Sequence, residues 1–133
     1  MRTIIRLTSI VLVVLLAAGI WTIYKSKSYY PTHPIPSMTK AELLSAVLSG
    51  DEGELIRLTE SDGEEWYAYR GDQTEGTRKM IDIMKDRHWE FKEQLGGAYI
   101  FQSDCKKDAV VESEMWTRKY RLYQVPTVTG QCL

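Results

Sequence analysis

Two histidines are the side chains best suited to acid–base chemistry near neutral pH, and the spacing implies no partner for either of them. His88 follows Arg87 at the predicted junction of a helix and a strand, and His33 lies in a proline-rich segment where we expect it to be solvated. Nucleophilic catalysis needs a base within hydrogen-bond reach of the nucleophile, whereas a helix end by itself only favours a cation. We therefore assign no catalytic residue from the sequence.

The two cysteines, Cys105 and Cys132, are compatible with a disulfide, with free thiols or with pairing between chains. An oxidising compartment would favour the disulfide. We predict a long final strand over residues 110–125, which ends at the far end of its hairpin from Cys105, so the tail would have to run back along the sheet to pair. The cysteines and histidines together lack the spacing of a zinc site, and we predict no metal site and no cofactor.

Acidic residues gather around the first predicted hairpin, and basic residues gather later in the chain. The acidic set is Asp51, Glu52, Glu54, Glu60, Asp62, Glu64 and Glu65. It lacks the alternating oxygen ligands of an EF-hand loop, and acidic residues at turns are usually solvated. The basic set is Lys106, Lys107, Arg118, Lys119 and Arg121. We expect the two sets to be solvated faces of complementary charge, with docking to an anionic membrane surface or cell-wall polymer as the alternative for the basic set.

Aromatic residues are unusually frequent on the predicted strands. They are Trp66, Tyr67, Tyr69, Trp89, Phe91, Tyr99, Phe101, Trp116, Tyr120 and Tyr123. We expect most of them to fill a small core, because strands favour aromatic side chains. Since a small sheet cannot bury both faces of every strand against two helices, we also expect some exposed rings that could recognise protein or sugar.

A capping box predicts the first helix of the folded part. The Thr39 hydroxyl can accept from the backbone N–H of Glu42, whose side chain can reach back to the cap. The apolar stripe that follows and a stop at Gly50 predict a helix over residues 40–49.

Alternating residues predict a β-hairpin after this helix. An Asp-Gly turn at residues 62–63 places Leu58 opposite Tyr67 and Ile56 opposite Tyr69, so we expect these four to form an apolar face on the core. The other face of the hairpin is predicted to be amphipathic.

The second half of the chain predicts a helix over residues 72–87, a hairpin of residues 89–95 and 98–103 around a Gly-Gly turn, and the final strand. The order helix, two strands, helix, three strands predicts an α+β domain with an antiparallel sheet and both helices on one face.

The first 24 residues predict a transmembrane signal anchor. Residues 7–24 carry no charge, and as a helix these 18 residues measure about 27 Å, close to the hydrocarbon thickness of a bilayer. The alternative is a signal peptide cleaved after Gly19, but the apolar residues that continue to Ile23 favour the uncleaved anchor. The short basic N-terminus predicts that the rest of the chain lies outside the cytoplasm.

A Pro-rich stalk is predicted to follow over residues 25–36, because three prolines in six residues favour extended backbone. This leaves residues 37–133 for one small α+β domain. Residues 25–133 carry 15 basic and 18 acidic side chains, so the domain lacks the basic balance of a nucleic-acid binder, and we expect no nucleic-acid partner.

The run at residues 89–101, together with residues 115–120 and the Val125-Pro126 pair, resembles small membrane-anchored proteins of Gram-positive bacteria that have no named function. The resemblance covers the second half of the domain and implies localisation only.

These patterns together predict a single-pass protein of the cell membrane whose C-terminal domain is an extracytoplasmic binding or interaction module for a protein or cell-envelope partner. The alternatives are a small hydrolytic enzyme that uses His88, and a secreted inhibitor or immunity-type protein released by signal cleavage. The binding residues and the oligomeric state stay open.

Overall fold

The computed structural model describes residues 1–25 and 31–132, and the chain divides into two compact units, Met1–Pro31 and Thr32–Leu133. The first unit contains helix α1 (Arg2–Lys25). By length and composition this helix can cross a membrane from Arg2 to Tyr24, and a secretory signal sequence has the same properties. Residues 26–30 of the predicted stalk lie outside the described residues.

Three hydroxyls of α1 are satisfied within the helix. Thr8, Ser9 and Thr22 each donate to a backbone carbonyl of the preceding turn, at 2.7 to 2.9 Å. Such bonds keep these three hydroxyls satisfied when a helix enters an apolar surrounding.

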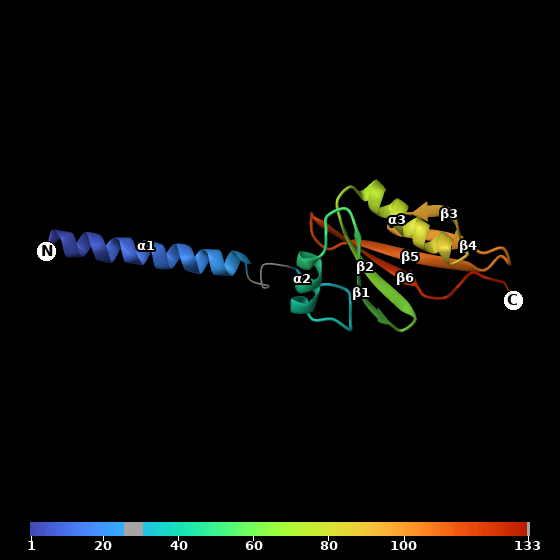
Figure 1. Ribbon diagram of the computed structural model, residues 1–133, viewed down its shortest axis with the longest axis horizontal. Helices are drawn as coiled ribbons and strands as arrows, with labels where there is room; N and C mark the ends of the chain where they lie inside the picture. The colour runs from blue at the N-terminus through green and yellow to red at the C-terminus, as the bar shows by residue number, and fades with distance from the viewer. Residues whose placement is uncertain (26–30, 133) are drawn as a thin grey trace. The chain divides into compact units, whose positions relative to one another are not determined.

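The second unit is an α+β domain, which confirms the predicted class. Its elements are α2 (Lys40–Ser49), β1 (Leu55–Ser61), β2 (Glu64–Arg70), α3 (Gln73–Asp86), β3 (Glu90–Leu95), β4 (Ala98–Gln102), β5 (Asp108–Met115) and β6 (Tyr120–Pro126). The strands form one antiparallel sheet in the order β1-β2-β6-β5-β4-β3 (Figure 1).

Side-chain caps start both helices of this unit. The predicted capping box is confirmed, with Thr39 accepting from the Glu42 backbone and Glu42 accepting from the Thr39 backbone. The Asp72 carboxylate accepts from the backbone N–H groups of Thr74 and Glu75, which fixes the first turn of α3.

The single long strand predicted over residues 110–125 is wrong, because the run forms two strands with a turn at residues 116–119 between them. The Thr117 hydroxyl accepts from the backbone N–H groups of Lys119 and Tyr120, both at 3.2 Å. A threonine side chain that closes a turn in this way reverses the chain without glycine or proline. Four strands therefore follow α3, rather than the three predicted.

The hairpin of β1 and β2 keeps its predicted two-residue turn, but its register changes halfway. The pairs next to the turn match the prediction, and a β-bulge at Leu58 then shifts the pairing by one residue. Tyr69 consequently lies opposite Leu55, not opposite Ile56 as predicted. Neither of the two predicted apolar pairs forms, because a bulge leaves one residue of its strand unpaired.

Helix α3 covers one face of the sheet. The core on this side consists of Tyr67, Tyr69, Met80, Met84, Trp89, Tyr99, Phe101, Val111, Tyr123 and Val125. The Thr77 hydroxyl of α3 lies 3.1 Å from the hydroxyl of Tyr99, so the helix is also tied to the sheet by a polar contact.

Helix α2 meets the opposite face, on the half formed by β1, β2 and β6. The Ile56 side chain lies against Gly50 at the end of α2, and the Tyr120 hydroxyl donates to the Val47 carbonyl at 3.5 Å. In the strand register, Ile56 and Tyr120 point away from the α3 side. The expectation that both helices share one face is wrong, because Ala68 and Leu122 make this second face apolar as well and both are fully buried.

Residues 32–36, which we predicted as part of the stalk, belong to the folded unit. Ile35 is only 2% exposed. The half-buried ring of His33 accepts from the Ile35 backbone N–H through Nδ1 at 3.2 Å, so His33 shapes this segment instead of being freely solvated. We call residues 32–36 the strap.

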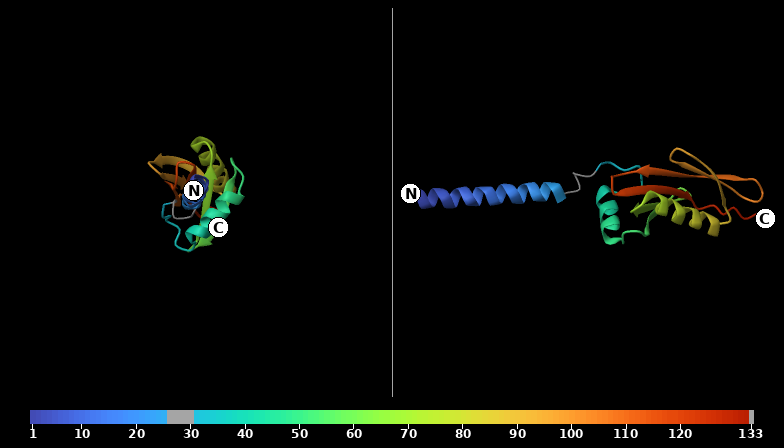
Figure 2. Two further views of the ribbon diagram at one scale, coloured as in Figure 1. Left: turned by 90° about the vertical axis from the view of Figure 1, so that its left-hand side faces the viewer. Right: turned by 90° about the horizontal axis from the view of Figure 1, so that it is seen from above.

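The turns between the last strands lie at opposite ends of the folded unit (Figures 1 and 2). The β4–β5 turn lies at the same end as the C-terminus, and the β5–β6 turn lies at the end where α2 is found. This arrangement decides where the cysteines and the basic residues are placed.

Candidate functional site

His88 is placed by the way α3 ends. Its φ of 66° lies in the left-handed region, and its backbone N–H donates to the Lys85 carbonyl at 3.0 Å. The N–H of Trp89 donates to the Met84 carbonyl at 3.0 Å. These two bonds form a Schellman motif, in which the left-handed position usually belongs to glycine. The backbone therefore accounts for the position of His88, whose side chain is exposed.

A shallow hollow of about 450 Å³ lies beside His88. It is lined by Ile81, Lys85, His88, Trp89, Glu90, Phe91 and Asp104. The hollow does bring His88 near two carboxylates. No hydroxyl or thiol lines it, however, and among the described residues the His88 ring has no hydrogen-bond or ion-pair partner. The nucleophile and base that a hydrolase of this kind needs are not paired here.

Cys105 and Cys132 form a disulfide, which settles the alternatives left open by the sequence. The disulfide fastens a C-terminal tail that is already bound to the domain. The Trp89 indole donates to the Val128 carbonyl at 2.8 Å, and the Gly130 backbone N–H donates to the Arg87 carbonyl at 2.8 Å. The tail is thus part of the fold that covers the end of α3.

Three members of the acidic set around the first hairpin take part in ion pairs, and two of them, Glu60 and Glu65, share Arg57. Glu54 pairs with Lys79 and Glu60 pairs with Arg57. Glu65 pairs with Arg87 of the α3 end. Within residues 1–25 and 31–132, no group of three His, Cys, Asp or Glu side chains is arranged to hold a metal ion.

The environment of Glu65 lowers the pKa of its carboxyl group. Burial of Glu65 raises its pKa, but hydrogen bonds from Tyr67 and Arg87 and the positive charges of Arg87 and Arg57 outweigh that effect. The Tyr67 hydroxyl donates to Glu65 at 2.7 Å, and burial together with this bond raises the pKa of Tyr67. This cluster joins β2 to α3 and has a structural role.

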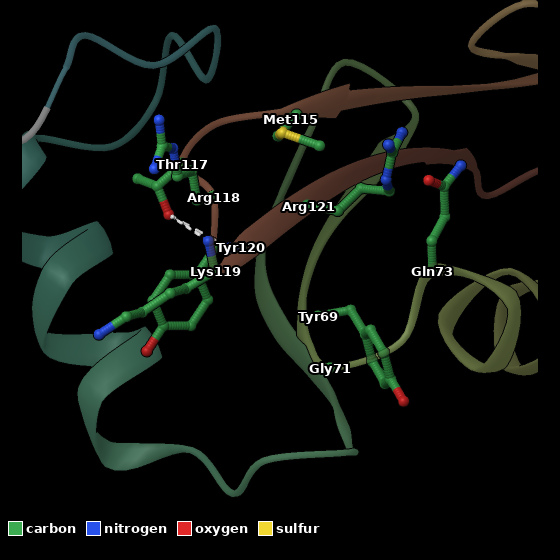
Figure 3. A pocket seen from close by; sticks show the side chains of 9 residues that line it. All are labelled: Tyr69, Gly71, Gln73, Met115, Thr117, Arg118, Lys119, Tyr120 and Arg121. Atoms are coloured by element: carbon green, nitrogen blue, oxygen red, sulfur yellow. Dashed lines mark hydrogen bonds between the residues drawn. The ribbon is translucent and has the colours of Figure 1, made fainter.

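The basic set does not form one surface. Lys106 and Lys107 lie on the β4–β5 turn, and Arg118 and Lys119 lie on the β5–β6 turn at the other end of β5. A pocket of about 60 Å³ adjoins the second turn (Figure 3). The charged groups of Arg118, Lys119 and Arg121 point in different directions there, so they do not converge on one bound anion (Figure 3).

The aromatic residues fill the interior, with one exception. Phe91 is 44% exposed, whereas the other nine predicted strand aromatics are buried. Both faces of β2 and β6 are covered, one by α3 and the other by α2 and the strap, which explains why so many rings are enclosed. The expectation of an exposed aromatic recognition surface is therefore wrong apart from Phe91.

One side of the sheet has no cover among the described residues. It is the side of β3, β4 and β5 that points away from α3, and we call it the open face. Its outward positions are Glu90, Glu93, Leu95, Ala98, Ile100, Gln102, Asp108, Val110, Glu112 and Glu114. Leu95 is 61% exposed and Val110 is 46% exposed, so this face has apolar side chains in contact with solvent.

A groove of about 230 Å³ borders the open face where the strap crosses the sheet. Pro34 of the strap forms one wall, and Glu112 and Glu114 of β5 form the other. Trp66 and Leu122 also line the groove. It therefore combines carboxylates with an indole ring, although Trp66 is only 7% exposed.

The open face also has a signature in the sequence. Asp108, Glu112 and Glu114 recur with a period of two along residues 108–114, whereas no charged residue occupies positions 109, 111 and 113, which is the period of a strand with one solvated side. No family model, curated protein or solved structure matches the chain. The chemistry of its surfaces is consequently the guide to its function.

Proposed function

We propose that this protein is a membrane-tethered interaction module whose folded unit lies outside the cytoplasm and binds a protein or cell-envelope partner through the open face. The observation that supports this proposal is the uncovered side of β3, β4 and β5, where Leu95 and Val110 are exposed, whereas both faces of β2 and β6 are covered. Contiguous exposed apolar side chains with a polar rim are typical of interaction sites.

Two features favour the location. Helix α1 has the length and composition of a membrane span, which would hold the folded unit near a bilayer. The Cys105–Cys132 disulfide is typical of an oxidising compartment outside the cytoplasm. The resemblance to membrane-anchored proteins of Gram-positive bacteria agrees with both features.

A hydrolytic function has weaker support. The hollow beside His88 contains the carboxylates of Glu90 and Asp104, but its lining includes no hydroxyl or thiol that could act as a nucleophile. The open face, by contrast, has the features of a binding surface without any catalytic group.

Site-specific photo-crosslinking in intact cells tests the proposal. A photoreactive amino acid at Val110 should give discrete crosslinked products, whereas the same group at Leu48 of α2, which is 68% exposed, should not. Equal crosslinking from both positions would contradict the open face as the binding site. A C-terminal tag should be cleaved by protease added outside the cells, and a protected tag would contradict the location. Mass measurement of the mature N-terminus would distinguish an anchored chain from one cleaved after Gly19.

A further inference from the structure

We infer that the open face binds a cationic polypeptide segment, with Lys or Arg side chains that meet its carboxylates and apolar side chains that meet its centre. The inference rests on the proposed function and adds the chemical class of the partner. It depends on three observations: the charge of the face, its apolar centre and the groove at its border.

Every charged side chain at a paired outward position of the open face is acidic. Strand β5 turns Asp108, Val110, Glu112 and Glu114 toward this side, so three of its four outward positions are acidic. Strand β3 adds Glu90 and Glu93, and no Lys or Arg occupies a paired outward position on the described strands β3 to β5.

These carboxylates are not neutralised within the domain. The ion pairs of the described residues involve Glu54, Glu60, Glu65 and Glu75, all outside the open face. An uncompensated acidic surface attracts a basic partner and repels acidic ones, which gives both a faster encounter and selectivity.

An apolar patch occupies the centre of the open face. Ile100 of β4 pairs directly with Val110 of β5, and Leu95 of β3 pairs with Ala98. Neighbours across an antiparallel sheet lie on the same side, so these four side chains form one surface between the carboxylates of β3 and β5. A partner with charged side chains alone would leave this apolar patch exposed to water. We therefore expect the partner to have apolar side chains between its basic residues.

The groove beside the strap suits the end of a basic side chain. Glu112 and Glu114 provide carboxylate oxygens on one side, and the nearly buried indole of Trp66 also lines the groove. Carboxylates and an indole are the groups that bind ammonium and guanidinium ions in proteins. A Lys or Arg side chain in this groove would anchor the segment at the border between β5 and the strap.

Other occupants fit these features less well. Anionic lipids, cell-wall phosphates and nucleic acid would be repelled by the carboxylates. A second copy of this chain could offer the β5–β6 turn with Arg118 and Lys119, and the test separates this case from a foreign segment.

The test uses the full chain in zwitterionic detergent micelles and a fluorescent peptide of alternating lysine and valine. We expect the peptide to bind, the affinity to fall as salt is added, and a matched peptide of alternating glutamate and valine not to bind. The triple variant E93Q/E112Q/E114Q should bind the lysine peptide about tenfold more weakly.

The matched control is E52Q/D82N/D86N, which removes the same number of charges from exposed positions outside the open face. We expect its affinity to stay within about twofold of the wild type, because long-range charge effects are screened. Equal weakening in both triple variants would overturn the inference, since it would show attraction to net charge alone. A second pair of variants tests the apolar centre: Val110→Ser should weaken binding, and Leu48→Ser should not.

Two further results would overturn the inference while distinguishing it from the proposed function. If the crosslinks from Val110 in cells persist unchanged in E93Q/E112Q/E114Q, the open face is an interaction site but its partner is not recognised by charge. If the chain self-associates in a way that R118Q/K119Q abolishes, the occupant is a second copy and not a foreign segment. If the photoreactive group at Val110 gives no crosslinked product in the otherwise wild-type chain, the proposed function itself is contradicted.

Discussion

Cys105 on the β4–β5 turn and Cys132 in the C-terminal tail are joined by a disulfide, with Cα atoms 5.9 Å apart although 27 residues separate them in sequence. The turn at residues 116–119 makes this possible. It sends β6 back toward the end of the sheet where β4 stops, so the tail emerges near Cys105. The tail therefore does not have to run back along the sheet, as it would after one long strand.

The double variant Cys105→Ser/Cys132→Ser should lower the free energy of unfolding by about 3.5 kcal/mol, because the closed loop would gain conformational freedom in the unfolded state. Urea unfolding of the full chain in detergent, followed by tryptophan fluorescence, measures the change. The wild type with reductant should unfold at the same midpoint as the variant. An oxidised wild type no more stable than the variant would contradict a stabilising disulfide.

The ion pair of Glu65 and Arg87 gives a second stability prediction. The two side chains are 12% and 23% exposed, and Arg87 also donates to the Pro126 carbonyl at 2.9 Å. Glu65→Gln should cost about 2 kcal/mol at pH 7, because the half-buried guanidinium loses its charged partner. Glu60→Gln is the control, since Glu60 is 52% exposed in its pair with Arg57 and should cost less than about 0.5 kcal/mol.

This pair also predicts how stability depends on pH. The pKa of Glu65 is lowered in the folded state, so its ionised form stabilises the fold above the pKa of the unfolded chain, near 4.5. That contribution is lost as the pH falls through the folded-state pKa. Unfolding should be measured from pH 6 to pH 3 in steps of about one pH unit. Over this range, the free energy of unfolding of the wild type should fall more than that of Glu65→Gln. Parallel pH curves for the two proteins would show that Glu65 does not titrate as we infer.

His88→Gly should raise the free energy of unfolding by roughly 0.5 to 1 kcal/mol. Glycine adopts the left-handed conformation of this position without the Cβ contact that strains His88, and it remains the usual residue of a Schellman motif. Binding of the lysine–valine peptide should not change, because His88 lies outside the open face. Thermal or urea unfolding measures the stability, and a destabilised variant would indicate that the imidazole makes contacts beyond those we describe.

Gly76→Ala should destabilise the domain even though alanine favours helix. A Cβ at Gly76 in α3 would lie 2.5 Å from the nearest ring atom of Tyr69, which is buried in the core. We expect a loss of about 1 to 3 kcal/mol from overpacking, larger than the gain in helix propensity. Thr74→Ala, at an exposed position of the same helix, should be neutral or slightly stabilising. A stabilised Gly76→Ala protein would mean that the Tyr69 ring can move aside without cost.

Features that depend on a few neighbouring residues were predictable. The capping box of Thr39 and Glu42, the turn at residues 62–63 and the alternation of helices with hairpins all follow from local hydrogen bonds and side-chain periodicity. The turn at residues 116–119 was missed because Thr117 closes it with a side chain, and apolar residues on both sides continue the strand pattern.

The candidate site was only partly predictable. The sequence indicated an exposed sheet face but suggested aromatic residues on it, whereas the open face presents carboxylates around Leu95, Ile100 and Val110. Which side of a strand meets solvent depends on what packs against the sheet. Here α3 takes one side, while α2 and the strap cover only the half formed by β1, β2 and β6.

By itself, the sequence determined an apolar N-terminal helix and an α+β domain with an antiparallel sheet, because length, periodicity and capping act over short distances along the chain. Only the tertiary structure decided the bulge at Leu58, the pairing of Cys105 with Cys132 and the uncovered acidic side of β5. Each of these depends on contacts between residues far apart in sequence, where register and direction are set by the packing of whole elements.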